Sequence, residues 1–304
     1  MRLAVLIVLA SSLTLTAAAS PPPSRAPLPV KTDPALLEQS PAVSGGYLAW
    51  GQSSRTTLHF DLIVQAGNGQ PFRVNPRGTQ ARPGGISGRT LAYQEWRGRH
   101  SDVRLFNLAS RKRVHLPRGV NTPNWEWRPS LSGRWLLFNR QNLRTKLEVV
   151  LLRNLRTGRQ IVLDRARAPE HVLAQQLAGR YAVWTHCRFR CFVVRYDRAN
   201  GTRIHLSSSG IPEDSDFAAS VLPNGTIYFV RGTMFCDPAV EQRVLLLRYS
   251  SATGTERIAD LEGTPAALFA TTEGGTPVVY FDRGPCRGED IYRIFDSPPP
   301  PPVP

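Results

Sequence analysis

The sequence predicts an all-β protein, a six-bladed β-propeller whose blades are four-stranded antiparallel sheets. A segment of about nine residues recurs six times between residues 42 and 281, at intervals of about 46 residues. Each copy is followed by short apolar runs that polar turns separate, and no dozen residues within the repeats show the 3.6-residue period of a helix. Units of this length, each with four strands, are typical of propeller blades.

The recurring segment combines a small-residue turn with a following strand that ends in an aromatic residue. The copies are AVSGGYLAW (42–50), GISGRTLAY (85–93), SLSGRWLLF (130–138), QLAGRYAVW (176–184), VLPNGTIYF (221–229) and ATTEGGTPVVYF (270–281). The matching aromatic residues are Trp50, Tyr93, Phe138, Trp184, Phe229 and either Tyr280 or Phe281. We therefore expect Trp135 and Phe138 to pack between neighbouring blades. The alternative, an exposed basic and aromatic surface for nucleic acid, is disfavoured.

The second half of each unit supplies two more strands. In EVVLLRNLRTGRQIVL (148–163), CFVVRYDRANGTRIHL (191–206) and RVLLLRYSSATGTERIAD (243–260), two apolar runs flank a polar turn that contains Gly. Gly and Asn favour such turns because they adopt positive φ readily. Segments 61–74 and 102–116 follow the same pattern less regularly.

The start of the chain has the form of a signal peptide. In residues 1–19, Arg2 precedes an apolar run, and three alanines end the segment at the expected cleavage point. The run is too short for a membrane span, which needs about 20 apolar residues. We therefore expect an exported protein without a membrane span, either secreted or held in the periplasm or cell envelope.

The propeller is expected over residues 41–296, between a Pro-rich linker (20–40) and a Pro-rich, disordered tail (297–304). The last unit has only three strands, since prolines follow IYRIFD (291–296) and end any further pairing. An open strand edge invites aggregation. We therefore expect part of residues 26–40 to pair beside 291–296 and complete the last blade.

The repeat resembles a known family. PSLSGRWLLF (129–138) is similar to the W-S-P-D-G-R-x-I-A-F signature of the TolB-like, WD40-like six-bladed propellers, and the resemblance covers residues 41–296. The S-P-D-G turn is worn down to Ser-Gly-Arg or Ala-Gly-Arg and survives best at residues 222–225. TolB carries an α/β domain before its propeller, and here only about 20 residues precede the first blade. The resemblance implies the fold, and no role in the Tol–Pal system is carried over.

The chain is strongly basic, with 38 Lys and Arg against 23 Asp and Glu and a formal net charge of +15. Such a surface could attract an anionic cell-envelope polymer. The arginines are scattered along the chain, however, and abundant Arg, Ala, Gly and Pro are also what a GC-rich genome produces. We favour codon usage as the cause and expect a monomer that does not bind nucleic acid.

Four cysteines in an exported chain indicate disulfides. Cys187 and Cys191 flank three residues in the fourth unit and are expected to pair across a hairpin. Cys236 and Cys286 fall in corresponding loops of the fifth and sixth units, which are neighbours in a propeller, and are expected to join them. The spacing argues against a zinc site, which would need two close pairs.

One face of the propeller is expected to carry long loops, where function usually lies. The connections between the second and third strands of the units are predicted at 51–60, 94–101, 139–146, 185–190, 230–242 and 282–289. The candidate binding residues on this face are Trp125, Glu126, Trp127, His171, Asp214 and Asp216. Aromatic and carboxylate side chains together suit a sugar or a peptide, and converging carboxylates could hold Ca²⁺. The competing interpretation is that these acids are solvated and that the tryptophans cover a core.

No motif of a known catalytic class occurs in the sequence: G-x-S-x-G, H-E-x-x-H, a Walker loop and an EF-hand loop are all absent. We therefore expect a non-enzymatic propeller without a cofactor that binds a protein or a cell-envelope polymer through its long-loop face. The alternative is a metal-dependent lactonase or esterase, in which channel carboxylates hold one divalent cation that activates water.

Overall fold

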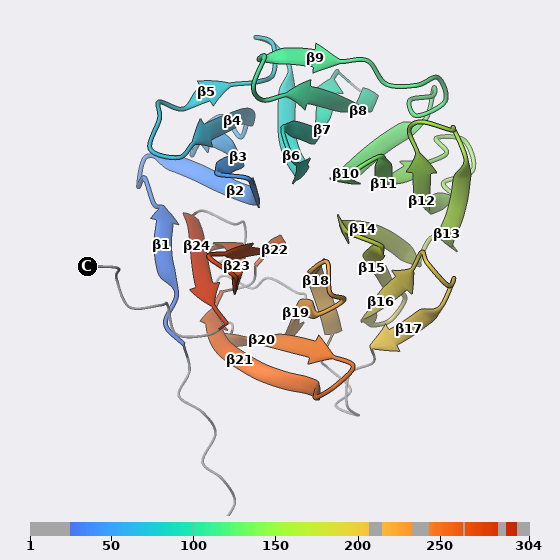
Figure 1. Ribbon diagram of the computed structural model, residues 1–304. Coiled ribbons are helices and arrows are strands. Elements are labelled where there is room, and N and C mark those ends of the chain that lie inside the picture. The colour runs from blue at the N-terminus through green and yellow to red at the C-terminus, as the bar shows by residue number, and fades with distance from the viewer. Residues whose placement is uncertain are drawn as a thin grey trace, which may run out of the picture.

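The computed structural model describes residues 25–98, 100–206, 215–232, 243–263, 265–284 and 290–296. In these residues the chain forms six four-stranded antiparallel sheets and no helix. The sheets stand around a common centre as the blades of a propeller (Figure 1). The predicted fold class is therefore confirmed. With no helix in the described part of the chain, none there is long and apolar enough to cross a membrane.

Strands A and B form the inner half of each blade. The innermost strands, A, are β2 (Leu36–Ser44), β6 (Gln80–Ser87), β10 (Trp125–Ser132), β14 (His171–Ala178), β18 (Ser215–Val221) and β22 (Leu268–Glu273). The B strands are β3 (Tyr47–Ser54), β7 (Thr90–Arg97), β11 (Trp135–Gln141), β15 (Tyr181–Cys187), β19 (Ile227–Gly232) and β23 (Thr276–Arg283).

Strands C and D form the outer half. The C strands are β4 (Asp61–Ala66), β8 (His100–Asn107), β12 (Glu148–Asn154), β16 (Cys191–Asp197), β20 (Arg243–Ser250) and β24 (Asp290–Phe295). The outermost strands, D, are β5 (Phe72–Arg73), β9 (Lys112–Val114), β13 (Gln160–Ala166), β17 (Arg203–Leu206), β21 (Gly254–Glu262) and, in the sixth blade, β1 (Leu28–Lys31).

The ring closes through β1, as the sequence predicts. This strand pairs antiparallel with β24, so that Leu28 faces Arg293 and Lys31 faces Ile291 (Figure 1). The guanidinium of Arg25 extends the contact by donating to the carbonyl oxygen of Phe295 at 2.9 Å and to the Asp296 carboxylate at 3.1 Å. The sixth blade thus contains one strand from the start of the chain and three from its end.

The recurring aromatic residues form the core, because each is at most 5% exposed. Phe138 of the third blade packs in one cluster with Ala92 and Val103 of the second. Trp135 is half-buried against the cluster that contains Trp184 of the fourth blade. Both residues therefore pack between blades, which confirms the structural interpretation of this segment.

The serine of the Ser-Gly turn links the second blade to the third and the third blade to the fourth. Ser87 Oγ accepts a hydrogen bond from the Gly133 amide at 2.8 Å, and Ser132 Oγ accepts one from the Gly179 amide at 2.9 Å. In the fourth blade Ala178 occupies the serine position and has no hydroxyl group to accept this bond. In these two copies the Ser-Gly pair therefore supplies both a turn and a contact with the next blade.

The loops between strands B and C are shorter than predicted in two blades. β7 continues to Arg97 and β8 begins at His100, while β15 reaches Cys187 and β16 begins at Cys191. The expected long loop at 94–101 is therefore mostly strand, half of the one at 185–190 is strand, and this part of the prediction is wrong. Polar residues in these segments still take part in strand pairing through their backbone, as Glu95 does opposite Asp102.

Candidate functional site

The loop face carries an aromatic groove at the start of the third blade. Trp125 and Trp127 lie two residues apart on β10, opposite Gln141 and Asn139 of β11, so both side chains project from the same side of the strand. Trp125 is 40% exposed, although it is a large apolar side chain. Glu126, between them, projects to the other side and is fully buried.

These two tryptophans share a cavity of about 290 Å³ with a third, Trp96 of the second blade. We call this cavity the Trp groove; it is lined by Gln94, Trp96, Ser101, Trp125, Trp127, Gln141 and Glu148. Hydrogen bonds hold two of its polar side chains in place. Gln94 Nε2 donates to Ser101 Oγ at 2.7 Å, and Ser101 Oγ donates to the Glu126 carbonyl at 2.7 Å. The groove combines flat apolar walls with fixed polar groups, as small-molecule and polymer sites do.

A second cavity, of about 240 Å³, adjoins the groove and shares Gln94, Trp96 and Trp127 with it. Its other lining residues come mainly from the inner strands of the first four blades and from residues 266–269, so it lies at the centre of the ring. We call it the channel cavity. Two arginines, Arg82 of β6 and Arg128 of β10, contribute to its wall.

The two channel arginines have aromatic and cationic neighbours. The Arg82 guanidinium lies 4.6 Å from the ring centre of Phe60 and 5.7 Å from that of Trp96. Within the described part of the chain, no carboxylate lies in ion-pair contact with Arg82 or Arg128. Burial lowers the pKa of both guanidinium groups, and the charge of Arg82 lowers that of Arg128 further.

Asp282 of β23 is a fully buried carboxylate whose charge acts on both arginines and opposes the lowering of their pKa. It accepts hydrogen bonds from the backbone amides of Ser40 at 2.9 Å and of Ala266 and Ala267 at 2.8 Å each. Burial raises the pKa of this carboxyl, although the three amides oppose the shift. Asp282 thus anchors the inner strand of the first blade to the sixth blade.

The candidate acids Glu126 and Asp216 lie in matching buried ion pairs. Glu126 accepts from Arg140 Nε at 2.8 Å and from Thr122 Oγ1 at 2.6 Å. Asp216 accepts from Arg231 Nε at 2.7 Å. Each pair joins strand A to strand B of one blade, and both carboxylates are 0% exposed. In this arrangement they stabilise the blade and do not face the groove.

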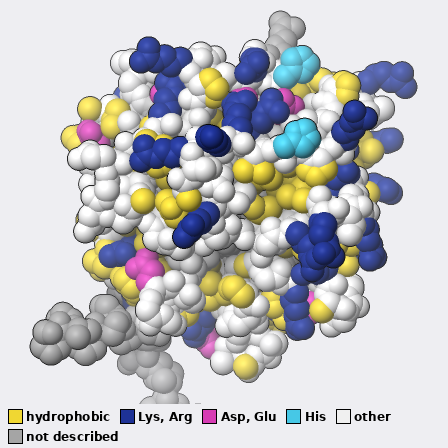
Figure 2. Space-filling model, turned by 45° about the horizontal axis from the view of Figure 1, so that its top comes forward, with side chains coloured by type: hydrophobic (Ala, Val, Ile, Leu, Met, Phe, Trp, Pro, Cys, Tyr) yellow, Lys and Arg dark blue, Asp and Glu magenta, His cyan; other side chains and the backbone are white. Residues whose placement is uncertain are grey.

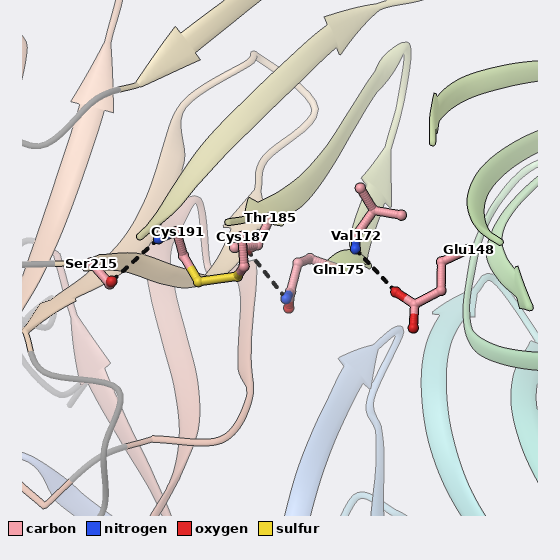
Figure 3. Close-up of a disulfide and its surroundings, with 7 residues drawn as sticks. All are labelled: Glu148, Val172, Gln175, Thr185, Cys187, Cys191 and Ser215. Carbon is pink, nitrogen blue, oxygen red and sulfur yellow. Dashed lines mark hydrogen bonds between the residues drawn. A yellow bond between two sulfur atoms is a disulfide. The ribbon is translucent and has the colours of Figure 1, made fainter. Parts of the chain in front are cut away.

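His171 begins β14, next to the groove. Its Nδ1 lies 3.2 Å from Oε1 of Glu148, a groove residue whose other oxygen accepts from the Val172 amide at 3.2 Å (Figure 3). Gln175, which lines the channel cavity, lies between this carboxylate and the disulfide of the fourth blade (Figure 3). The structure therefore brings Trp125, Trp127 and His171 to one region of the loop face.

The predicted disulfide between Cys187 and Cys191 is present and closes the hairpin between β15 and β16 (Figure 3). Phe189 at the tip of this hairpin is 88% exposed. The other predicted pair, Cys236 with Cys286, lies outside the described residues, as does the candidate Asp214. The predicted signal peptide and C-terminal tail lie outside them too.

The described residues contain no group of three or more His, Cys, Asp or Glu side chains placed to hold a metal ion. In this region Glu126 and Asp216 are paired with arginines, and Asp282 is held by backbone amides. On the face of the molecule shown in Figure 2, dark blue Lys and Arg side chains are widespread, and Asp and Glu are few among them.

Trp96, Arg82 and Arg128 are not among the residues predicted from the sequence. One signal was available in the repeat itself. An Arg-Pro dipeptide precedes the Ser-Gly turn in two successive copies, Arg82-Pro83 about five residues and Arg128-Pro129 about four residues before the serine. Comparing the positions just before each turn would have placed these residues together on the innermost strands.

Known structures share the fold of this chain. Against TolB from Acinetobacter baumannii the TM-score is 0.56 at 16% identity over 82% of this chain and 63% of the other. Against a putative TolB from Agrobacterium tumefaciens it is 0.57 at 15% identity over 85% and 90% of the two chains. The likeness is one of fold. It confirms that the fold resembles that of TolB-like propellers. This chain spans less than two thirds of the length of the Acinetobacter protein.

A calcium-binding protein, regucalcin from Agrobacterium tumefaciens, is similar to the same extent, with a TM-score of 0.57 at 12% identity over 89% of this chain and 93% of the other. No family model and no curated protein matches the sequence. Since propellers with different functions resemble this chain equally well, the fold does not select among functions, and the site must do so.

Proposed function

We propose that this protein is an exported, non-enzymatic binding propeller that contacts a protein or a cell-envelope polymer through its loop face. The Trp groove carries the proposal. Three tryptophans from two neighbouring blades converge there beside a second cavity, and one of them is 40% exposed. Exposed aromatic side chains beside a pocket are frequent anchors of interfaces.

Two further observations support the proposal. The candidate acids Glu126 and Asp216 are engaged in buried ion pairs, which favours a structural role for them over acid–base or metal chemistry. The N-terminal sequence has the form of a signal peptide, and the disulfide suits an oxidising compartment outside the cytoplasm.

The test is affinity capture from a cell-envelope extract with the wild type and with the Trp125→Ala, Trp127→Ala double variant. We expect the double variant to lose the captured material, because both side chains line the groove. The matched control is Phe189→Ala, which removes another exposed aromatic residue from the same face but outside the groove. Equal capture by the double variant and the wild type would exclude the groove as the binding site.

The alternative, a metal-dependent lactonase or esterase, draws support from the likeness to a calcium-binding protein. Elemental analysis of the purified protein, together with turnover assays on lactones and simple esters, separates it from the binding proposal. A stoichiometric divalent metal with measurable turnover would replace the binding function with the hydrolytic one.

A further inference from the structure

The channel cavity contains two positive charges that the chain itself does not neutralise by direct contact. Arg82 and Arg128 both line it, and no described carboxylate is in ion-pair contact with either. Elsewhere in the same blades, arginines are paired: Arg104 with Glu95 at 3.2 Å, and Arg140 with Glu126 at 2.8 Å. Among the described residues, the two channel arginines thus lack the carboxylate partner that Arg104 and Arg140 have.

Asp282 does not fill this role. Its oxygens already accept the amides of Ser40, Ala266 and Ala267, and it is outside ion-pair contact with both arginines. Two partly buried guanidinium groups near each other are unfavourable unless an anion compensates them. A bound anion between Arg82 and Arg128 would offset both the burial and the mutual repulsion.

The backbone holds Arg128 in an unusual conformation. Its φ is +49°, in the left-handed region that non-Gly residues rarely adopt because the backbone is strained there. Arg128 and Pro129 together oppose Phe138 alone, so β10 contains a bulge at this point. Bulges next to functional sites re-aim side chains, and here the bulge accompanies an arginine in the channel wall.

The rest of the lining indicates which kind of anion is recognised. A guanidinium matches a carboxylate through two parallel hydrogen bonds. Around the arginines lie the side-chain amides of Gln39, Gln94 and Gln175 and the rings of Trp96 and Trp127. Amides can bind several hydroxyl groups, and a flat indole ring can cover the face of a sugar ring. This combination favours an acidic sugar over a peptide carboxylate, which would need fewer polar partners.

We propose that the channel cavity binds the carboxylate of an acidic sugar unit between Arg82 and Arg128, while adjoining units of the same polysaccharide lie along the Trp groove. The inference rests on the proposed function and specifies the polymer as one that contains uronic acids. The continuity of the two cavities through Gln94, Trp96 and Trp127 gives such a chain a path from groove to channel.

Calorimetric titration with tetramers of glucuronic acid tests the inference, with glucose tetramers as the neutral probe and tetraglutamate as the peptide probe. We expect the wild type to bind the acidic sugar at least about tenfold more tightly than either other probe, since hydrogen bonds to charged groups are strong. In Arg82→Gln and Arg128→Gln this preference should fall about tenfold each. Arg128→Lys keeps the charge but not the two parallel donors of the guanidinium. Its preference for the acidic sugar should therefore lie between that of the wild type and that of Arg128→Gln.

Arg97→Gln is the matched control, because Arg97 is exposed on the same face, ends β7 and lies outside both cavities. It should bind as the wild type does, and thermal melts of every variant report whether the fold is kept. Equal affinity for the acidic and neutral sugars, undetectable binding of the acidic sugar, or tighter binding of tetraglutamate would each overturn the inference. The affinity capture from envelope extract is a separate experiment. Capture that depends on Trp125 and Trp127 would therefore still support the proposed function if the acidic sugar does not bind.

Discussion

A β-bulge recurs in the inner strands, and the residues at it differ in role from blade to blade. The first five inner strands each shift register beside the recurring aromatic residue of strand B. Ser40, Arg128 and Ala218 have positive φ at these shifts. At Ser40 the freed amide binds Asp282, whereas at Arg128 the bulge accompanies a side chain in the channel wall. One backbone device thus serves both cohesion and the candidate site.

Glu126 and Arg140 give a prediction about pH. Burial raises the pKa of the Glu126 carboxyl, and Arg140 opposes that shift. A carboxyl whose pKa is higher in the folded than in the unfolded state stabilises the fold at low pH and loses this contribution as the pH rises through the folded pKa. Arg140→Leu removes the opposing cation, so its stability at pH 7 should fall by about 3–5 kcal/mol.

Urea unfolding between pH 7 and pH 5 checks this expectation. Arg140→Leu should regain more stability than the wild type as the pH falls, because its buried Glu126 takes up a proton. The Glu126→Gln, Arg140→Leu double variant lacks the carboxyl and is the control, with no such gain. A single variant whose stability changes with pH as the wild type does would contradict the role given to this pair.

Gly84 tests the contact between the second and third blades. A Cβ atom on Gly84 would lie 1.7 Å from the carbonyl oxygen of Pro129, which is backbone and cannot move aside alone. Gly84→Ala should therefore lower the unfolding free energy by about 1–3 kcal/mol or more. Gly51→Ala is the control, since a Cβ there meets its neighbours at 3.5 Å or beyond. Thermal melts that show no difference between the two variants would refute this account.

At the scale of elements, cohesion comes from strands that contact the next blade as well as their own. The amide of Leu177 donates to Ser130 Oγ at 2.9 Å, and the amide of Ala270 donates to Ser220 Oγ at 2.6 Å, each across a blade boundary. β1 extends this principle to the whole ring, because it joins the first residues of the propeller to its last strand. Each blade is therefore stabilised by its neighbours, and the closing strand stabilises the first and last blades.

Removal of β1 tests the closure. A chain that begins at Thr32 lacks β1 but keeps all of β2, and a chain that begins at Arg25 is the control. The shorter chain loses the pairing with β24 and leaves that strand as an open edge, so its unfolding free energy should be lower by about 2–4 kcal/mol, with a greater tendency to aggregate. Identical melting temperatures for the two chains would show that β1 does not close the ring.

At the scale of the whole molecule, the sequence predicts the fold better than the site. A propeller repeats one unit, so the spacing of the Ser-Gly turns and of the buried aromatic residues is visible along the chain. The channel is different, because Arg82, Arg128 and Trp96 are neighbours only after the ring has formed. The lengths of the loops between strands B and C were also predicted wrongly in places, because polar residues such as Glu95 pair within the strands and do not belong to the loop. Trp125 and Trp127 were identified because they lie together in sequence just before the repeated segment that begins at residue 130.

Photo-cross-linking in envelope extract tests whether the loop face is the binding face. Photoreactive p-benzoylphenylalanine is placed at position 125, in the groove, or at position 135, where β11 leaves the short turn on the opposite face. We expect cross-linked envelope material from position 125 and none from position 135. Equal cross-linking from both positions, or cross-linking from position 135 alone, would contradict it.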